Sequence, residues 1–290
     1  MLGIFRPINL LLLTFTQFSL WYKLSLPFIT EKSIIQIIVE FSVLCCGTLL
    51  ITAAGYLIND IYDEEIDKIN KPDKLYIGKF ISKKNALNIY ISLNITALLL
   101  AVYLFNLGII IIYLSAILLL YLYSAYLKKT AFWGNFSVAL LSAAVVAELI
   151  LYYQSYLTEK QLVFYVSYCS FAFLTTLLRE LVKDLQDKDG DEAHGGRTLA
   201  IILPMFYIKA ILFSINALLL FSLIIAFRYL FNGIYFSDSF AMIYWLFLLL
   251  IPTFFLFGPI LFYNTKAQFA KQSELIKIYM FLGLIWVWTF

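Results

Sequence analysis

Residues 55–74, GYLINDIYDEEIDKINKPDK, decide what kind of molecule this chain forms. An apolar run that begins at residue 34 leads into them, and the composition then changes abruptly to acidic. Asp60, Asp63 and Asp67 stand at relative positions 0, 3 and 7, which places three carboxylates on one stripe if the segment is helical. Because three like charges on one stripe repel one another, the spacing indicates a binding function.

A second acidic stretch, RELVKDLQDKDGDEAHGGRTLA at residues 179–200, repeats this spacing. Asp184, Asp187 and Asp191 stand at the same relative positions, 124 residues later, and they also follow the end of an apolar run. One copy alone would be compatible with an ordinary solvated segment. Two matched copies predict two related halves of one molecule that face a shared cavity.

The composition of the 290 residues places the chain in a membrane. Hydrophobic residues make up 63% of it and charged residues 13%, whereas a soluble domain is typically about 45–50% apolar and about 25% charged. In water such a chain would expose large apolar patches that soluble proteins avoid. The same figures exclude a disordered chain, and a scattered net charge of only +3 excludes a nucleic-acid binder.

Continuous apolar runs predict an all-α protein that crosses the membrane about nine times as a helical bundle. A membrane-spanning helix needs about 20 mostly apolar residues, and the runs lack the alternation of period two that an outer-membrane barrel would show. We expect one domain over residues 1–290. The predicted membrane helices are residues 8–29, 34–58, 86–106, 108–127, 135–157, 161–182, 204–231, 238–263 and 273–290.

The distribution of basic residues predicts the orientation of the chain in the membrane. With the N-terminus in the cytoplasm, 17 of the 21 Lys and Arg residues fall on the cytoplasmic side, as expected for cytoplasmic segments. The two longest and most polar connections, about 59–85 and 183–203, lie on that side as well. We therefore expect the active site to face the cytoplasm of a cell inner or plasma membrane.

Six aspartates at these positions suit a magnesium site. Mg²⁺ prefers oxygen ligands, and it typically takes one or two carboxylates together with waters and substrate phosphates. Two acidic stripes that face each other would hold Mg²⁺ ions around a diphosphate and neutralise the charge that develops as it leaves. The predicted metal ligands are Asp60, Asp63, Asp67, Asp184, Asp187 and Asp191.

Two other classes of protein use similar residues. An ion-coupled carrier also places carboxylates in a membrane, but transporters bind near the membrane midplane, whereas these aspartates lie at helix ends. A soluble isoprenyl-diphosphate synthase also carries paired aspartate motifs, but on amphipathic rather than fully apolar helices. The carrier remains as a remote alternative.

The two acidic stretches resemble the aspartate-rich motifs of the UbiA-type intramembrane prenyltransferases. Residues 55–74 match the first motif, NDxxDxxxD, and residues 179–200 the second. The opening Arg6-Pro7-Ile8-Asn9 and the segment LYSAYLKKTAFWGN (122–135) are also similar, so the resemblance covers essentially the whole chain. It implies an enzyme that uses Mg²⁺ to transfer a prenyl group from an isoprenoid diphosphate to a lipophilic acceptor.

The resemblance also implies roles for individual residues. Asn59 and the six aspartates would bind the Mg²⁺–diphosphate directly or through water, with Asp60, Asp63 and Asp187 most directly involved in catalysis. Departure of the diphosphate requires positive charge on the leaving group and exclusion of water from the carbocation that remains. The residues expected to supply that charge or to contact the substrate are Lys128, Arg197, Lys183, Arg6, Asn9 and Tyr123.

One position departs from the family pattern. Many members carry Tyr-x-x-x-Lys between the fourth and fifth helices, whereas four residues separate Tyr123 from Lys128 in this chain. Two other ionisable residues keep alternative roles. Glu148 lies within an apolar run, where it serves either packing or a cavity. His194, the only histidine, either belongs to the polar connection that follows the second motif or acts as a base on the acceptor.

Within the family, the acidic stretches are most similar to the branch that prenylates geranylgeranylglyceryl phosphate in ether-lipid synthesis. Branches that prenylate an aromatic quinone precursor, of the hydroxybenzoate or dihydroxynaphthoate type, share the same aspartate motifs. The expected partners are thus a prenyl diphosphate, a lipophilic acceptor and membrane lipid. The quinone-precursor branch is the alternative for the acceptor.

Overall fold

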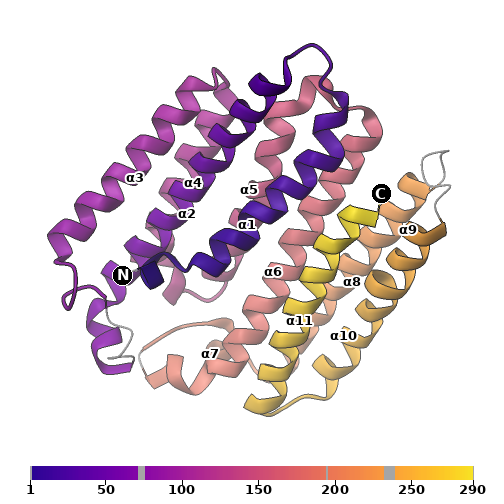
Figure 1. Cartoon of the computed structure of the whole chain (residues 1–290). Coiled ribbons are helices and arrows are strands. Elements are labelled where there is room, and N and C mark those ends of the chain that lie inside the picture. The colour runs from indigo at the N-terminus through magenta and orange to yellow at the C-terminus, as the bar shows by residue number, and fades with distance from the viewer. Residues whose placement is uncertain (1, 71–75, 194, 232–238, 290) are drawn as a thin grey trace.

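The computed structural model describes most of the chain. It covers residues 2–70, 76–193, 195–231 and 239–289, and within them the side chains other than those of residues 2, 66–70, 193, 231, 239–240 and 257–260. Helices dominate these ranges and run side by side as one bundle (Figure 1). The predicted all-α fold is therefore confirmed.

Eleven α-helices are present in the described residues, and short 3₁₀ or π-helical turns extend several of them. They are α1 (Pro7–Leu20), α2 (Ile34–Asn70), α3 (Lys83–Tyr103), α4 (Leu107–Ala125), α5 (Trp133–Tyr153), α6 (Glu159–Ala193), α7 (Leu199–Ile202), α8 (Met205–Phe231), α9 (Ser239–Tyr244), α10 (Ile251–Phe262) and α11 (Lys266–Trp286).

Six of these helices are long and apolar enough to cross a membrane: α2, α3, α4, α5, α6 and α8. The other three predicted runs are helical as well, in α1 with the turns that follow it, in α9 with α10, and in α11. Each predicted run thus corresponds to a helical segment, while the count of nine crossings stays a prediction.

Two π-helical turns connect helical pieces within single runs. One, Trp21–Ser25, extends α1, and the other, Trp245–Leu250, joins α9 to α10. Each ends two residues before a proline, Pro27 or Pro252. Because proline has no N–H and its ring clashes with the preceding turn, a regular α-helix cannot pass through it undisturbed, and a π-turn is one way to absorb the mismatch.

The aspartate motifs lie on helices and not in loops, which corrects the expected connections at 59–85 and 183–203. Helix α2 has 37 residues and α6 has 35, so each is about 50–55 Å long at 1.5 Å per residue. The hydrocarbon core of a bilayer is about 30 Å thick. The last turns of both helices therefore extend beyond it, and they carry the acidic residues.

The last long helix begins earlier than predicted. Helix α11 starts at Lys266 and not near residue 273, because a capping box fixes its first turn. The Thr265 hydroxyl accepts from the Gln268 N–H, and the Gln268 side chain accepts from the Thr265 N–H. The first turns are polar, so a search for apolar runs misses them.

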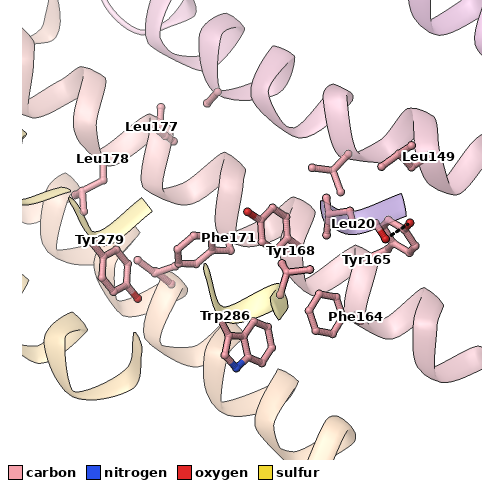
Figure 2. Close-up of a cluster of buried hydrophobic side chains, with 14 of the residues drawn as sticks. Leu20, Leu149, Phe164, Tyr165, Tyr168, Phe171, Leu177, Leu178, Tyr279 and Trp286 are labelled. Atoms are coloured by element: carbon pink, nitrogen blue, oxygen red, sulfur yellow. Dashed lines mark hydrogen bonds between the residues drawn. The ribbon is translucent and has the colours of Figure 1, made fainter. Parts of the chain in front are cut away.

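Helix α6 forms the centre of the molecule. It packs against α5, α8 and α11, and aromatic side chains fill the space between them (Figure 2). Phe164 stacks on Trp286 of α11 at 4.8 Å between ring centroids, and Phe171 contacts Tyr279 at 5.4 Å. Because α6 contacts α5 on one side of the sequence and α8 and α11 on the other, it connects the N-terminal helices of the bundle to the C-terminal ones.

The N-terminal half is built on α2, which packs against α3 and α4. A small second core lies at the end of α2 that bears the aspartates. It joins the N-terminal turn to α2, to the segment before α3 and to the start of α3, and consists of Ile4, Leu57, Ile58, Ile61, Ile77 and Ala86. This core fixes the segment that leads into α1.

The opposite end of α1 contacts the end of the chain. Trp288 donates from its indole nitrogen to the Ser19 hydroxyl at 2.8 Å and stacks on Phe15 and Tyr22. Helix α1 is therefore held at both ends, by the small core at one and by an aromatic cluster at the other. In Figure 1 its first turn lies at the same end of the bundle as the last turns of α2 and α6.

Candidate active site

The first motif forms a connected set of charges on the last turns of α2. The Asn59 amide donates to Asp63 Oδ2 at 2.9 Å, which the i, i+4 spacing on one helix face allows. The other oxygen of Asp63 accepts from the Lys128 ammonium. Lys128 belongs to a short 3₁₀ turn, Leu127–Lys129, between α4 and α5.

Asp60 is paired with Arg6, which enters from the N-terminal turn. The guanidinium lies 3.3 Å from Asp60 Oδ1 and 4.7 Å from the ring centroid of Tyr56. Arg6 has φ 49° and ψ 63°, in the left-handed region, although it is not glycine and it precedes a proline, which disfavours helical conformations. Such strain is characteristic of functional positions.

The second motif contacts a residue outside both acidic stretches. The Asn135 amide donates to Asp184 Oδ2 at 2.7 Å. Asn135 lies in the first turn of α5, directly after Gly134. A Cβ on Gly134 would stand 2.8 Å from the Leu127 carbonyl oxygen and 3.2 Å from the Lys128 Cα, so only glycine allows α5 to start so close to the 3₁₀ turn.

The segment 127–135 therefore contacts both motifs. Lys128 near one end bonds to Asp63 of α2, and Asn135 at the other end bonds to Asp184 of α6. Its backbone also receives two hydrogen bonds from the chain after α6, from Arg197 N–H to Lys129 O at 3.2 Å and from Leu199 N–H to Ala131 O at 3.1 Å. The two acidic helix ends thus meet at one short segment.

Tyr123 lies in the last turns of α4, and its phenol is within electrostatic range of both motifs, of Asp63 in the first and of Glu180 and Asp184 in the second. The structure thus brings Lys128 to Asp63 and leaves Tyr123 near both motifs. The role predicted for this pair stays a prediction.

The other predicted residues are more peripheral or only partly described. Asp187 and Asp191 are half-buried on the same helix as Asp184, whereas Lys183, Arg197 and Asn9 are exposed. Asp67 belongs to α2, but its side chain is outside the described residues, and so is His194. The roles predicted for all of them stay predictions.

Two contacts were not predictable from the motifs. Asn135 lies at the end of a segment that resembles the family, but nothing in the sequence indicated that it would contact Asp184. Arg179, the first residue of the second acidic stretch, is bonded to the adjacent Glu180 at 2.6 Å, and its buried Nε has no partner in the described structure. This N–H group can therefore donate a hydrogen bond to a further acceptor.

The carboxylates suit Mg²⁺ held jointly with a substrate. In the described part of the chain, no three His, Cys, Asp or Glu side chains converge closely enough to hold a metal by themselves. Mg²⁺ does not need such a cage, because it commonly binds through one or two carboxylates plus substrate phosphates. Asp63 and Asp184 would each contribute one carboxylate, from opposite sides of the site.

Glu148 lies in a separate buried cluster. It stands 13 residues after Asn135 on α5, about 20 Å away at 1.5 Å per residue. The Thr48 hydroxyl contacts its two oxygens at 2.7 and 2.8 Å, and the Gln17 amide donates to one of them. Of the two alternatives, packing is thus the supported one, since these bonds join α1, α2 and α5.

Comparison with known proteins identifies the family. The model of the UbiA prenyltransferase family matches residues 13–285, so the chain belongs to the UbiA prenyltransferase family and is an integral membrane prenyltransferase. The digeranylgeranylglyceryl phosphate synthase of Korarchaeum cryptofilum is 36% identical over 246 residues, which cover 83% of this chain and 82% of that protein. The predicted resemblance to this branch is confirmed.

Solved structures confirm the fold. A structure described as that of digeranylgeranylglyceryl phosphate synthase superposes with a TM-score of 0.77 at 23% identity, over 99% of this chain and 95% of the other. A UbiA homolog from Archaeoglobus fulgidus, bound to GPP and Mg²⁺, gives 0.64 at 16% identity, over 99% and 98% of the two chains. Both of these structures therefore share the fold of this chain.

Proposed function

We propose that the protein transfers a geranylgeranyl group from its diphosphate to the free hydroxyl of geranylgeranylglyceryl phosphate, with Mg²⁺, and releases diphosphate. The observation that carries this proposal is the convergence of both acidic motifs on residues 127–135 through Lys128 and Asn135. The name of the Korarchaeum relative supports the acceptor, and the Archaeoglobus homolog, bound to GPP and Mg²⁺, supports the donor and the metal.

The first motif binds one side of the diphosphate in this proposal. When bound, Mg²⁺ supplies positive charge that stabilises the leaving diphosphate. Asp63 and Asp60 hold the metal, Asn59 fixes one oxygen of Asp63, and Asp67 extends the same stripe. Because Lys128 and Arg6 are already bonded to these carboxylates, they stand where a phosphate oxygen would bind and add charge at the leaving group.

The second motif binds the opposite side. Asp184, Asp187 and Asp191 hold metal there, while Arg197 and Lys183 act on the phosphates from the rim. Asn9 and Tyr123 contact the substrate between the two sides. These residues surround the diphosphate on several helices, so that its position is fixed before the C1–O bond breaks.

Bond breaking and bond formation balance without a redox partner. The C1–O bond of the prenyl diphosphate breaks, the acceptor oxygen forms an ether bond to C1, and its proton leaves with the diphosphate or to water. The carbocation character on C1 must be protected from water, which would give an alcohol. Apolar helices and aromatic faces around the site provide that protection.

We also propose that residues 1–290 act as one domain whose N-terminus and active site face the cytoplasm. The excess of basic residues at the end of the bundle that bears the aspartates supports this orientation. The prenyl diphosphate is water-soluble at its charged end and would reach the site from that side, whereas its tail and the acceptor enter from the lipid.

The test is a transfer assay with purified protein in liposomes. Labelled geranylgeranyl diphosphate and Mg²⁺ are supplied with geranylgeranylglyceryl phosphate, hydroxybenzoate or dihydroxynaphthoate. We expect transfer to the glycerophosphate alone, abolished by EDTA and reduced at least about 10²-fold in Asp63→Asn and Asp187→Asn, since each removes charge that holds the metal. Lys129→Met, an exposed neighbour of Lys128, is the matched control and should keep activity.

Other outcomes would redirect the proposal. Transfer only to an aromatic acid would keep the reaction and replace the acceptor. If no acceptor is prenylated and no Mg²⁺-dependent binding of the diphosphate is found, the proposed donor, metal and acceptor all fail.

A further inference from the structure

Each acidic motif has one carboxylate that accepts a hydrogen bond from an asparagine amide, Asp63 in the first and Asp184 in the second, but the amide comes from a different place in each. In the first, Asn59 and Asp63 belong to the same helix, one turn apart, and the amide donates to Oδ2 of the aspartate. In the second motif, position 180, four residues before Asp184, is a glutamate. An acidic side chain there cannot donate a hydrogen bond to a carboxylate when it is ionised.

Asn135 provides the missing amide from another helix. Its Nδ2 donates to Oδ2 of Asp184 at 2.7 Å, so the contact reproduces the one that Asn59 makes in the first motif, with the same donor and acceptor atoms. The amide occupies Oδ2, so Oδ1 is the oxygen of Asp184 that could bind metal. The sequence repeat does not show this similarity, because it aligns Asp184 with Asp60 rather than with Asp63, and because the second amide lies 49 residues before its aspartate.

The position of Asn135 is fixed by its surroundings. Gly134 lets the first turn of α5 contact the Leu127 carbonyl and the Lys128 backbone, and the Ala131 carbonyl accepts from Leu199 N–H beyond the second motif. A side chain held in this way presents its amide in one direction. Because the backbone around Asn135 is fixed, its amide can hold the Asp184 carboxylate in one orientation.

We propose that Asn135 is a positioning residue that orients the Asp184 carboxylate for metal, in the way that Asn59 orients Asp63 in the first motif. This inference rests on the proposed function, because it concerns the same Mg²⁺–diphosphate site. Partners that orient metal-binding carboxylates typically contribute 10–100-fold to metal affinity or activity.

The experiment measures metal binding directly. Mn²⁺ replaces Mg²⁺, and its free concentration is followed by electron paramagnetic resonance as it is titrated into the purified protein with inorganic diphosphate. For Asn135→Ala and Asn135→Leu we expect an apparent Kd for Mn²⁺ that is about 10–100-fold higher than in the unaltered protein. Asn135→Ser keeps a hydroxyl donor on the same backbone and should recover part of the loss.

The matched control is Asn216, a buried asparagine elsewhere in the bundle. Asn216 on α8 donates to the Thr253 carbonyl at 3.2 Å, far from the aspartates in sequence. Asn216→Ala also deletes one hydrogen bond of a side-chain amide, so it should lower thermal stability and leave the Mn²⁺ affinity within about twofold. A general loosening of the bundle would weaken metal binding in both variants alike.

The outcomes separate the two proposals. If the unaltered protein does not bind Mn²⁺ in the presence of diphosphate, the proposed function fails and this inference fails with it. If the unaltered protein binds and Asn135→Ala binds equally well, only the positioning role is overturned. Equal losses in Asn135→Ala and Asn216→Ala would overturn it too, since the effect would then be one of stability.

Discussion

At the scale of the single residue, Arg6 combines strain with charge. Its backbone lies at φ 49°, which costs an L-residue roughly 1–2 kcal/mol, and its guanidinium is bonded to Asp60. The small core around Ile4 supports this conformation from the preceding turn. The backbone is thus held in an unfavourable shape that places a cation at the first motif.

Two substitutions separate the backbone effect from the charge effect. Arg6→Gly and Arg6→Ala both remove the guanidinium, but glycine adopts positive φ without penalty. We expect Arg6→Gly to be more stable than Arg6→Ala by about 1 kcal/mol, measured by thermal unfolding in one detergent. Affinity for inorganic diphosphate with Mg²⁺ should fall equally in both, and a difference between them in binding would contradict the proposed phosphate contact.

The residues of the site were predictable to different degrees, for a physical reason. Asn59 and Asp63 are one helical turn apart, so their contact follows from the sequence interval alone. Lys128 was predicted from a family pattern, and the structure brings it to Asp63. Asn135 contacts Asp184 across 49 residues of sequence. No local pattern in the sequence indicates that the start of α5 will contact the end of α6.

At the scale of the helix, the boundaries were harder to predict than the presence of the helices. Apolar runs identify the parts of α2 and α6 inside the membrane, because burial in lipid requires those residues. Beyond the membrane both helices continue on residues with ordinary helix propensity, and nothing in the hydropathy marks where they end. The polar start of α11 was missed for the same reason.

The contact between α6 and α11 depends on a close approach at Gly283. A Cβ there would lie 2.3 Å from Cε1 of the buried Phe171 ring, so Gly283→Ala should destabilise the protein by about 1–3 kcal/mol through overpacking. Gly190 on α6 is the control, because a Cβ there would meet nothing within 4 Å.

Gly190→Ala should stabilise by up to about 1 kcal/mol, since alanine is the better helix former. Both variants are measured as a shift in the midpoint of thermal unfolding. Shifts of the same sign would show that helix propensity, and not the contact with Phe171, decides the effect at Gly283.

At the scale of the whole molecule, the proposed orientation places the segment before α3 in the cytoplasm and the connection between α1 and α2 on the opposite side. Lys79 and Thr30 are exposed in these two places. Cys45, Cys46 and Cys169 are first replaced by serine or alanine, because Cys46 is exposed and would react as well.

In that background, a membrane-impermeant thiol reagent should label Lys79→Cys only from the cytoplasmic face and Thr30→Cys only from the other face. Inside-out and right-side-out vesicles supply the two faces. The reverse pattern would place the active site on the outer side and contradict the proposed orientation.

The buried cluster around Glu148 bears on how the chain enters the membrane. Thr48 lies 100 residues before Glu148 in the sequence, and Gln17 lies 131 residues before it. At ordinary rates of synthesis, Glu148 is therefore made about 5–20 s after Thr48. Until then the polar groups of α1 and α2 lie in or near lipid without the carboxyl group that later joins them. The buried contacts of the N-terminal half therefore cannot all form while α1 and α2 are being inserted. They form only after α5 has been inserted.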